Sequence, residues 1–106
     1  MAVWIRWCAR EGETPGWDIE FSTESGLVAV EVKGTTGKTF SSIELTRGEL
    51  EAARQKGKLY WLYLVADVLT HYPRIQCIND PAQLLSHGNI LAEPILWRLT
   101  FASNRL

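Results

Sequence analysis

Hydrophobic and polar residues alternate strictly along two neighbouring stretches in the first third of the chain. The apolar set comprises Trp17, Ile19, Phe21, Val28, Val30 and Val32. The polar set comprises Asp18, Glu20, Glu31 and Lys33. A period of two is typical of half-buried β-strands. The pattern therefore predicts two strands that share one apolar face and one charged face.

The turn between these strands decides which charged residues meet. Glycine suits a tight hairpin loop, so Ser25-Gly26 is predicted as a two-residue turn. That loop places Asp18 opposite Lys33 and Glu20 opposite Glu31, all on one face. Asp18 and Glu31 then become diagonal neighbours with Cβ atoms roughly 7 Å apart. Two carboxylates at that separation can share a divalent cation, with Lys33 in reach, or the set can be a solvated face on which Lys33 pairs with Asp18.

A helix and a buried strand are predicted next. Thr46-Arg47-Gly48-Glu49 has the spacing of a capping box, and Gly57 can end the helix. Residues 58–65, KLYWLYLV, are almost continuously apolar, which is typical of a central strand covered on both faces. A strand, helix and strand in succession favour a parallel pair inside an otherwise antiparallel sheet. The fold class is therefore α/β with a mixed sheet.

The two ends of the chain carry weaker strand patterns. Residues 2–10 predict a first strand that pairs with the hairpin and completes an antiparallel meander. Residues 74–78 predict another strand, and Asp80-Pro81 predicts the start of a short helix that runs to Ser86. Residues 90–101 predict a final strand, which Pro94 confines to an edge or a bulge.

Composition and charge limit the class of protein. A chain of 106 residues, 46% of them hydrophobic, predicts one globular domain over residues 1–106. No apolar run approaches the length of a membrane span, so we expect a cytoplasmic protein with no membrane partner. Residues 1–31 carry two basic and six acidic groups, whereas residues 32–58 carry six basic and three acidic groups. This asymmetry suits a metal pocket beside phosphate contacts, or two solvated faces of opposite sign.

Three segments together resemble a known family. The runs GWDIEF, EVKGTTG and ELTRGELEAARQKGKLYWLYLV occur in the order and spacing of NO VEIN C-terminal-like domains. That group is a branch of the PD-(D/E)xK, or restriction-endonuclease-like, nuclease superfamily found in restriction-associated and helicase-linked proteins. The resemblance covers about residues 3–80. It implies a core of a three-stranded meander, a helix and a further strand.

The resemblance also implies a catalytic site and a reaction. Asp18 and Glu31 would be Mg²⁺ ligands, with Mn²⁺ as a substitute, and the Val32 carbonyl would complete the protein's share of the coordination. Lys33 would stabilise the transition state or help to position the attacking water. The expected reaction is Mg²⁺-dependent hydrolysis of phosphodiester bonds in DNA, within a restriction, defence or DNA-processing protein. Mg²⁺ prefers a few carboxylate oxygens together with water, which agrees with these residue types.

The same resemblance bears on the partners of the protein and on whether its catalytic site is complete. Family members carry a helix ahead of the first strand, often with an acidic residue that joins the site, so this chain is either minimal or a fragment; Glu11 and Glu20 are the nearest substitutes. Lys38, Arg47 and Lys58 are candidate nucleic-acid contacts or ordinary surface charges. A homodimer and fused or associated helicase or ATPase domains are plausible partners. The alternative function is a catalytically inactive module that binds nucleic acid or protein.

Overall fold

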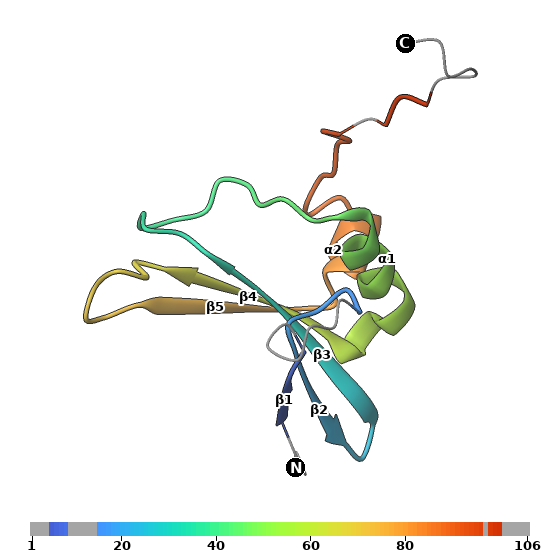
Figure 1. Cartoon of the computed structure of the whole chain (residues 1–106), viewed down its shortest axis with the longest axis horizontal. Helices are drawn as coiled ribbons and strands as arrows, with labels where there is room; N and C mark the ends of the chain where they lie inside the picture. The colour runs from blue at the N-terminus through green and yellow to red at the C-terminus, as the bar shows by residue number, and fades with distance from the viewer. Residues whose placement is uncertain (1–4, 9–14, 97, 101–106) are drawn as a thin grey trace.

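The computed structural model describes residues 5–8, 15–96 and 98–100. Its elements are five strands, two α-helices and one 3-10 turn. In chain order they are β1 (Ile5–Trp7), β2 (Ile19–Thr23), β3 (Gly26–Gly34), α1 (Arg47–Lys56), η1 (Gly57–Leu59), β4 (Tyr60–Ala66), β5 (Arg74–Asn79) and α2 (Pro81–Ser86). Both helices pack at one side of a strongly twisted sheet (Figure 1).

The five strands form one mixed sheet in the order β1-β2-β3-β4-β5. Neighbouring strands are antiparallel except β3 and β4, which run parallel and are joined through α1. The predicted meander, crossover helix and parallel strand are therefore confirmed. Placing β4 between β3 and β5 explains its apolar sequence. Its two faces differ, however, because Tyr60, Leu62 and Leu64 are buried whereas Trp61 and Tyr63 are only partly buried.

The β2–β3 hairpin has a different register from the predicted one. Thr23 pairs with Gly26, so the loop is Glu24-Ser25 and glycine follows it rather than lying within it. Gly26 adopts a φ of 127°, a conformation that favours glycine. The paired register ends at Ile19 and Val30, and the Asp18 N–H donates to the Val30 carbonyl, so Asp18 lies at the end of the ladder and not in the predicted pair with Lys33. The shift of two residues keeps every paired side chain on its predicted face.

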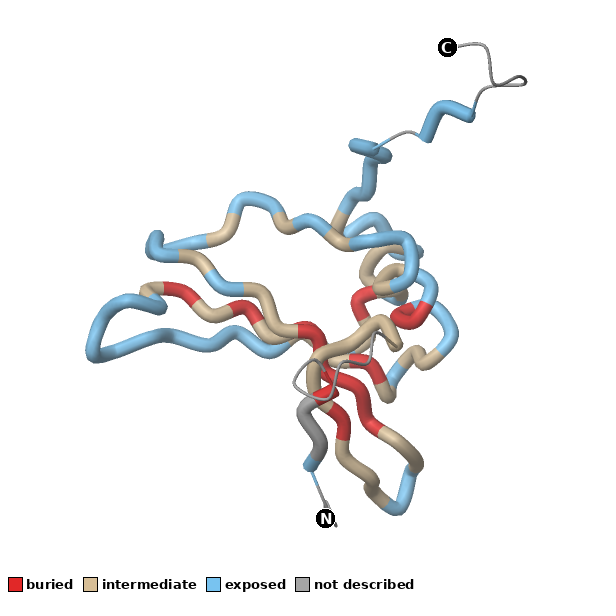
Figure 2. The backbone as a smooth tube through the Cα atoms, in the orientation of Figure 1, coloured by how far each residue is buried: buried red, intermediate tan, exposed pale blue. Residues whose placement is uncertain are grey.

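Helix α1 covers the charged face of the hairpin. The buried core under the helix contains Ala29 and Tyr60 from the sheet and Ala52 and Ala53 from α1. Ala29 pairs with Tyr60 in the parallel register, and Glu31 pairs with Leu62 two residues further on. Side chains two apart share a face, so Glu31 lies on the same covered face as the core. Figure 2 shows the buried part of the chain concentrated where the middle strands meet α1. The charged set is therefore not a solvated face.

A glycine lets the segment before β2 approach α1. Gly16 has a φ of 103°, and a Cβ atom there would lie 2.9 Å from the Cβ of Ala52 and 2.9 Å from the carbonyl oxygen of Gly48. The buried Tyr60 hydroxyl donates a hydrogen bond of 3.0 Å to the Gly16 carbonyl. Any larger residue would push this segment off the helix. The contact fixes the backbone that leads to Asp18.

The ends of the chain give mixed outcomes. The strand predicted at residues 2–10 is confirmed at Ile5–Trp7, whereas residues 2–4 and 9–10 lie outside the described part. Helix α2 begins as predicted, with the Asp80 side chain accepting from the Gln83 N–H and proline at its first turn. The strand predicted at residues 90–101 is wrong for residues 90–96 and 98–100, which form no strand. Pro94 lacks an N–H, and exposed side chains such as Leu91 (91% exposed) pack against no sheet.

Within the described residues, no helix is long and apolar enough to cross a bilayer.

Candidate active site

Asp18 is held against β3 by two hydrogen bonds to the backbone of that strand. Its N–H donates to the Val30 carbonyl at 2.9 Å, and its carboxylate Oδ2 accepts from the Val32 N–H at 2.8 Å. Asp18 immediately precedes β2, and these bonds fix its carboxylate near Glu31, whose pKa its negative charge raises. The site prediction for Val32 concerned its carbonyl. The contact found here uses its N–H, so the carbonyl role stays a prediction.

Glu31 lies in the middle of β3 and is 3% exposed. Its Oε2 is 3.2 Å from the Lys33 ammonium, whereas its buried Oε1 has no hydrogen-bond partner among the described residues. Burial raises the pKa of this carboxyl from 4.5 to about 8, and the negative charges of Asp18 and Glu49 add to the effect. An unpaired oxygen on a buried acid is unfavourable in a site that serves only stability.

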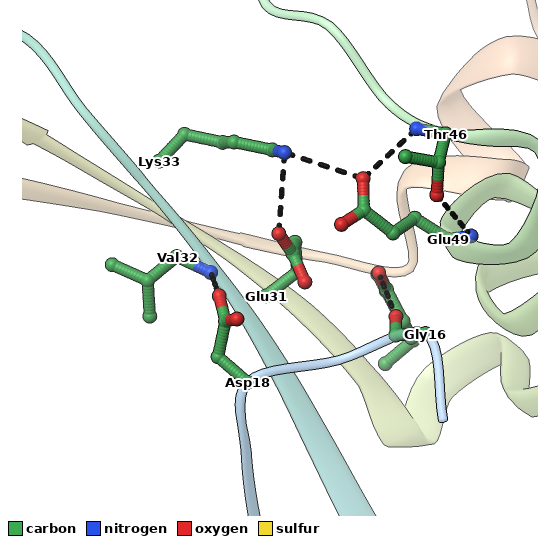
Figure 3. A network of polar contacts seen from close by, with 8 residues as sticks. Gly16, Asp18, Glu31, Val32, Lys33, Thr46 and Glu49 are labelled. Atoms are coloured by element: carbon green, nitrogen blue, oxygen red, sulfur yellow. Dashed lines mark hydrogen bonds and ion pairs between the residues drawn. The ribbon is translucent and has the colours of Figure 1, made fainter. Parts of the chain in front are cut away.

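Lys33 bridges two carboxylates. Its Nζ atom is 3.2 Å from Glu31 Oε2 and 3.2 Å from Glu49 Oε1, and its side chain is 24% exposed (Figure 3). Burial disfavours the ammonium form, but the hydrogen bonds and charges of both acids outweigh it and raise the pKa of Lys33 above 10.5. Lys33 therefore carries its positive charge throughout the neutral range.

Glu49 joins this network from α1. Its Oε1 accepts the Thr46 N–H at 2.9 Å, and its own N–H donates to Thr46 Oγ1 at 3.1 Å, which confirms the predicted capping box. Burial opposes ionisation, but the Thr46 N–H, the neighbouring Glu31 carboxyl and the Lys33 ammonium lower the pKa of the Glu49 carboxyl below 4.5. The capping spacing identified Glu49 as a helix-start residue. Its contact with Lys33 depends on how α1 crosses the sheet, for which the sequence carries no local signal.

Glu20 and Glu11 are the two residues expected to replace the acid of an upstream helix, and the structure describes only Glu20. Glu20 is buried and accepts a hydrogen bond of 2.7 Å from the indole N–H of Trp17. It lies on β2 opposite Ala29, two residues after Asp18 along the chain. Glu11 lies outside the described residues.

The three candidate nucleic-acid contacts lie on separate elements. Lys38 is exposed in the loop after β3, where its carbonyl accepts from the Arg74 guanidinium. Arg47 opens α1, is 91% exposed and pairs with Glu51 at 3.2 Å. Lys58 is exposed in η1, and its carbonyl accepts from the Asn79 amide at 2.8 Å. All three side chains are accessible, but they form no cluster with Lys33 in the described contacts.

A polar cavity opens beside Lys33. It has a volume of about 390 Å³ and lies between the end of β3 and the loop that leads to α1. The cavity is lined by Lys33, Gly34, Thr35, Thr39, Phe40, Ser41, Ser42, Ile43 and Glu44. Two hydrogen bonds of 2.9 Å fix the start of the loop that lines the cavity. The Thr35 N–H donates to the Val65 carbonyl, and the Asp67 N–H donates to the Gly37 carbonyl. A polar ligand could therefore reach the Lys33 ammonium from solvent.

The acidic residues are too few to bind a metal without other ligands. Within residues 5–8, 15–96 and 98–100, no three His, Cys, Asp or Glu side chains lie close enough together to hold an ion. A cation between Asp18 and Glu31 would need further oxygens from backbone carbonyls or water, which Mg²⁺ commonly uses. The pair, with its unpaired buried oxygen, fits such an ion.

Comparisons with known proteins bear on the family. Neither the curated proteins nor the solved structures contain a match to this chain. The family model described as "Protein NO VEIN, C-terminal" matches residues 2–78, well over half of the 106 residues. The matched region includes β1 to β4, α1 and every residue of the site described above. The chain therefore belongs to the NO VEIN C-terminal family.

Proposed function

We propose that this domain is a Mg²⁺-dependent nuclease that hydrolyses phosphodiester bonds in DNA. One observation carries the proposal: the Asp18 carboxylate is bonded to the β3 backbone at Val32, close enough to the buried Glu31 for its charge to raise the Glu31 pKa, and the Lys33 ammonium is 3.2 Å from Glu31. Two acids and a lysine on one sheet face are the residue types that the PD-(D/E)xK superfamily uses. Assignment of the NO VEIN C-terminal family to that superfamily, and DNA as substrate, are part of the proposal.

The donor set favours a hard divalent cation. Asp18 and Glu31 would supply carboxylate oxygens, and the Val32 carbonyl would be a third protein ligand. The unpaired Oε1 of Glu31 supports this assignment, because a bound cation would satisfy a buried oxygen that has no hydrogen-bond partner among the described residues. When bound, Mg²⁺ or Mn²⁺ supplies a water of lowered pKa and offsets negative charge on the phosphate.

The remaining residues act through charge and position. Lys33 keeps its ammonium at neutral pH and would place a point charge beside the scissile phosphate. The Val32 N–H holds the Asp18 carboxylate in a fixed orientation, so little reorganisation is needed when substrate binds. Lys38, Arg47 and Lys58 are proposed as contacts to flanking phosphates, because each side chain is exposed.

A cleavage assay with isosteric variants tests the function. Supercoiled plasmid and an RNA of matched length would be incubated with the chain in Mg²⁺ and in EDTA. Asp18→Asn keeps an oxygen for the Val32 N–H but loses the charge, and Lys33→Met loses the ammonium. We expect each to lower the cleavage rate about 100-fold or more. The matched control is Asp80→Asn at the start of α2, because asparagine caps a helix as well as aspartate does.

The outcomes separate the proposal from its alternative. Plasmid cleavage that requires Mg²⁺ and is lost in both site variants, but not in the control, supports a DNA nuclease. DNA binding without cleavage contradicts it and indicates a catalytically inactive binding module. Cleavage of RNA but not of plasmid would contradict the assignment of DNA as substrate.

A further inference from the structure

Lys33 has two acidic partners that come from different elements. Glu31 is on the same strand, two residues earlier, and Glu49 is on the first turn of α1. Both contacts are 3.2 Å long, and both acids are largely buried, with side chains 4% and 18% exposed. Figure 3 shows the ammonium between the two carboxylates. The lysine is therefore tied to the strand and to the helix at once.

The two partners cannot have the same role once Glu31 binds a cation. Glu31 Oε2 contacts the Lys33 ammonium, while its Oε1 is unpaired in the described contacts. A divalent cation on this carboxylate would repel the nearby ammonium and weaken its hold on Oε2. Glu49 would then be the remaining anion that keeps Lys33 in the site.

We propose that Glu49 is a positioning residue that holds the Lys33 ammonium beside the reacting phosphate when Glu31 is occupied by the metal. This inference rests on the proposed nuclease function. Glu49 acts through Lys33 and does not itself contact substrate or metal. Its place at the start of α1 makes the helix a rigid support for the lysine, since the capping box fixes both the backbone N–H and the carboxylate of Glu49.

A purely structural role for Glu49 must be separated from this one. Its Oε1 accepts from Thr46 as well as from Lys33, so an alanine variant would lose both the cap and the ion pair. Glutamine also completes a capping box, so Glu49→Gln keeps the helix start and removes only the charge. The matched control is Glu51→Gln, which removes a charge from the same helix, where Glu51 pairs with the exposed Arg47 and not with Lys33.

The test is a double-mutant cycle on the full chain with two measurements. Glu49→Gln and Glu51→Gln are made with Lys33 present and in a Lys33→Met background. Plasmid cleavage gives kcat and KM, and calorimetry gives the Kd for Mn²⁺ without substrate. With Lys33 present, we expect Glu49→Gln to lower kcat about tenfold or more with KM changed less than about twofold. It should also weaken Mn²⁺ binding about fivefold, because Lys33 then remains on Glu31.

The methionine background decides how Glu49 acts. If Glu49 works through Lys33, Glu49→Gln changes kcat by less than about twofold there, whereas the direct effect of its charge on Glu31 changes the Mn²⁺ Kd alike in both backgrounds. Equal losses of kcat in both backgrounds would overturn the proposal, since Glu49 would then act on the metal or on the fold. Loss of kcat in Glu51→Gln to the same extent would also overturn it. If the unsubstituted chain binds Mn²⁺ but does not cleave, the proposed function fails and this inference falls with it. An active chain that Glu49→Gln does not affect refutes this inference alone.

Discussion

The buried carboxyl of Glu31 makes a strong prediction about stability. Its pKa is raised from 4.5 to about 8. Between pH 4.5 and about 8, the folded protein therefore keeps a proton on Glu31 that the unfolded chain has released. The unfolded state binds fewer protons in this range, so the free energy of unfolding falls as pH rises. The stabilisation that comes from the protonated Glu31 carboxyl is fully present below pH 4.5 and is lost by the time the pH exceeds about 8.

The size of the effect follows from the same values. Each pH unit between 4.5 and about 8 removes about 1.4 kcal/mol, which gives an upper limit of roughly 4–5 kcal/mol for the ionised side chain at pH 9. Glutamine mimics the protonated acid at every pH. Its amide faces Lys33 less favourably than a carboxyl does, so we expect Glu31→Gln to raise the free energy of unfolding by about 2–4 kcal/mol at pH 9. At pH 5 the variant and the parent should differ by less than about 1 kcal/mol.

The assay is urea unfolding in EDTA at pH 5, 7 and 9. Lys33 and Glu49 do not confuse the result, because the pKa of Lys33 is raised above 10.5 and that of Glu49 is lowered below 4.5, both outside the range. Glu24→Gln in the exposed hairpin loop is the matched control and should change stability by less than about 0.5 kcal/mol at each pH. A Glu31→Gln variant that is no more stable than the parent at pH 9, or whose advantage does not grow with pH, would refute the reasoning.

Three further predictions concern the supports of the site, and each is measured by urea unfolding at pH 7. Gly16→Ala should destabilise the domain by about 2–4 kcal/mol, because φ is 103° and the new Cβ would lie 2.9 Å from that of Ala52; an unchanged midpoint would contradict this packing. Tyr60→Phe removes the hydrogen bond to the Gly16 carbonyl and should cost about 1–2 kcal/mol, whereas a gain in stability would show that the bond contributes nothing. Thr46→Ala removes the acceptor for the Glu49 N–H and should cost about 1 kcal/mol; no loss would argue against the cap.

The parts of the fold that the sequence predicted correctly depend on local signals. Alternation along β2 and β3 reports side-chain direction directly, so both strands and their faces were predictable. The capping box marked the start of α1 because Thr46 and Glu49 satisfy each other's N–H groups within one turn. The predicted hairpin register was wrong because glycine can lie inside a tight turn or follow it, and Gly26 follows it.

The parts that the sequence did not predict depend on tertiary packing. Alternation distinguishes the two faces of β3 but not which one a helix covers, so the burial of Glu31 under α1 emerged only from the fold. The contact between Lys33 and Glu49 joins residues 16 positions apart across the crossover, where no periodic pattern operates. The strand predicted at residues 90–101 failed because apolar composition alone provides no hydrogen-bonding partner for an extended segment.

We propose that Asp18 and Glu31 together hold a divalent cation, and Mn²⁺ calorimetry tests this most directly. The unsubstituted chain, Asp18→Asn, Glu31→Gln and the control Asp80→Asn would be titrated in the same buffer at pH 8, after each has been shown to unfold cooperatively. We expect one Mn²⁺ site in the parent and in the control, and no measurable site in either of the other variants. Binding that survives both Asp18→Asn and Glu31→Gln, or no binding by the parent, would contradict it.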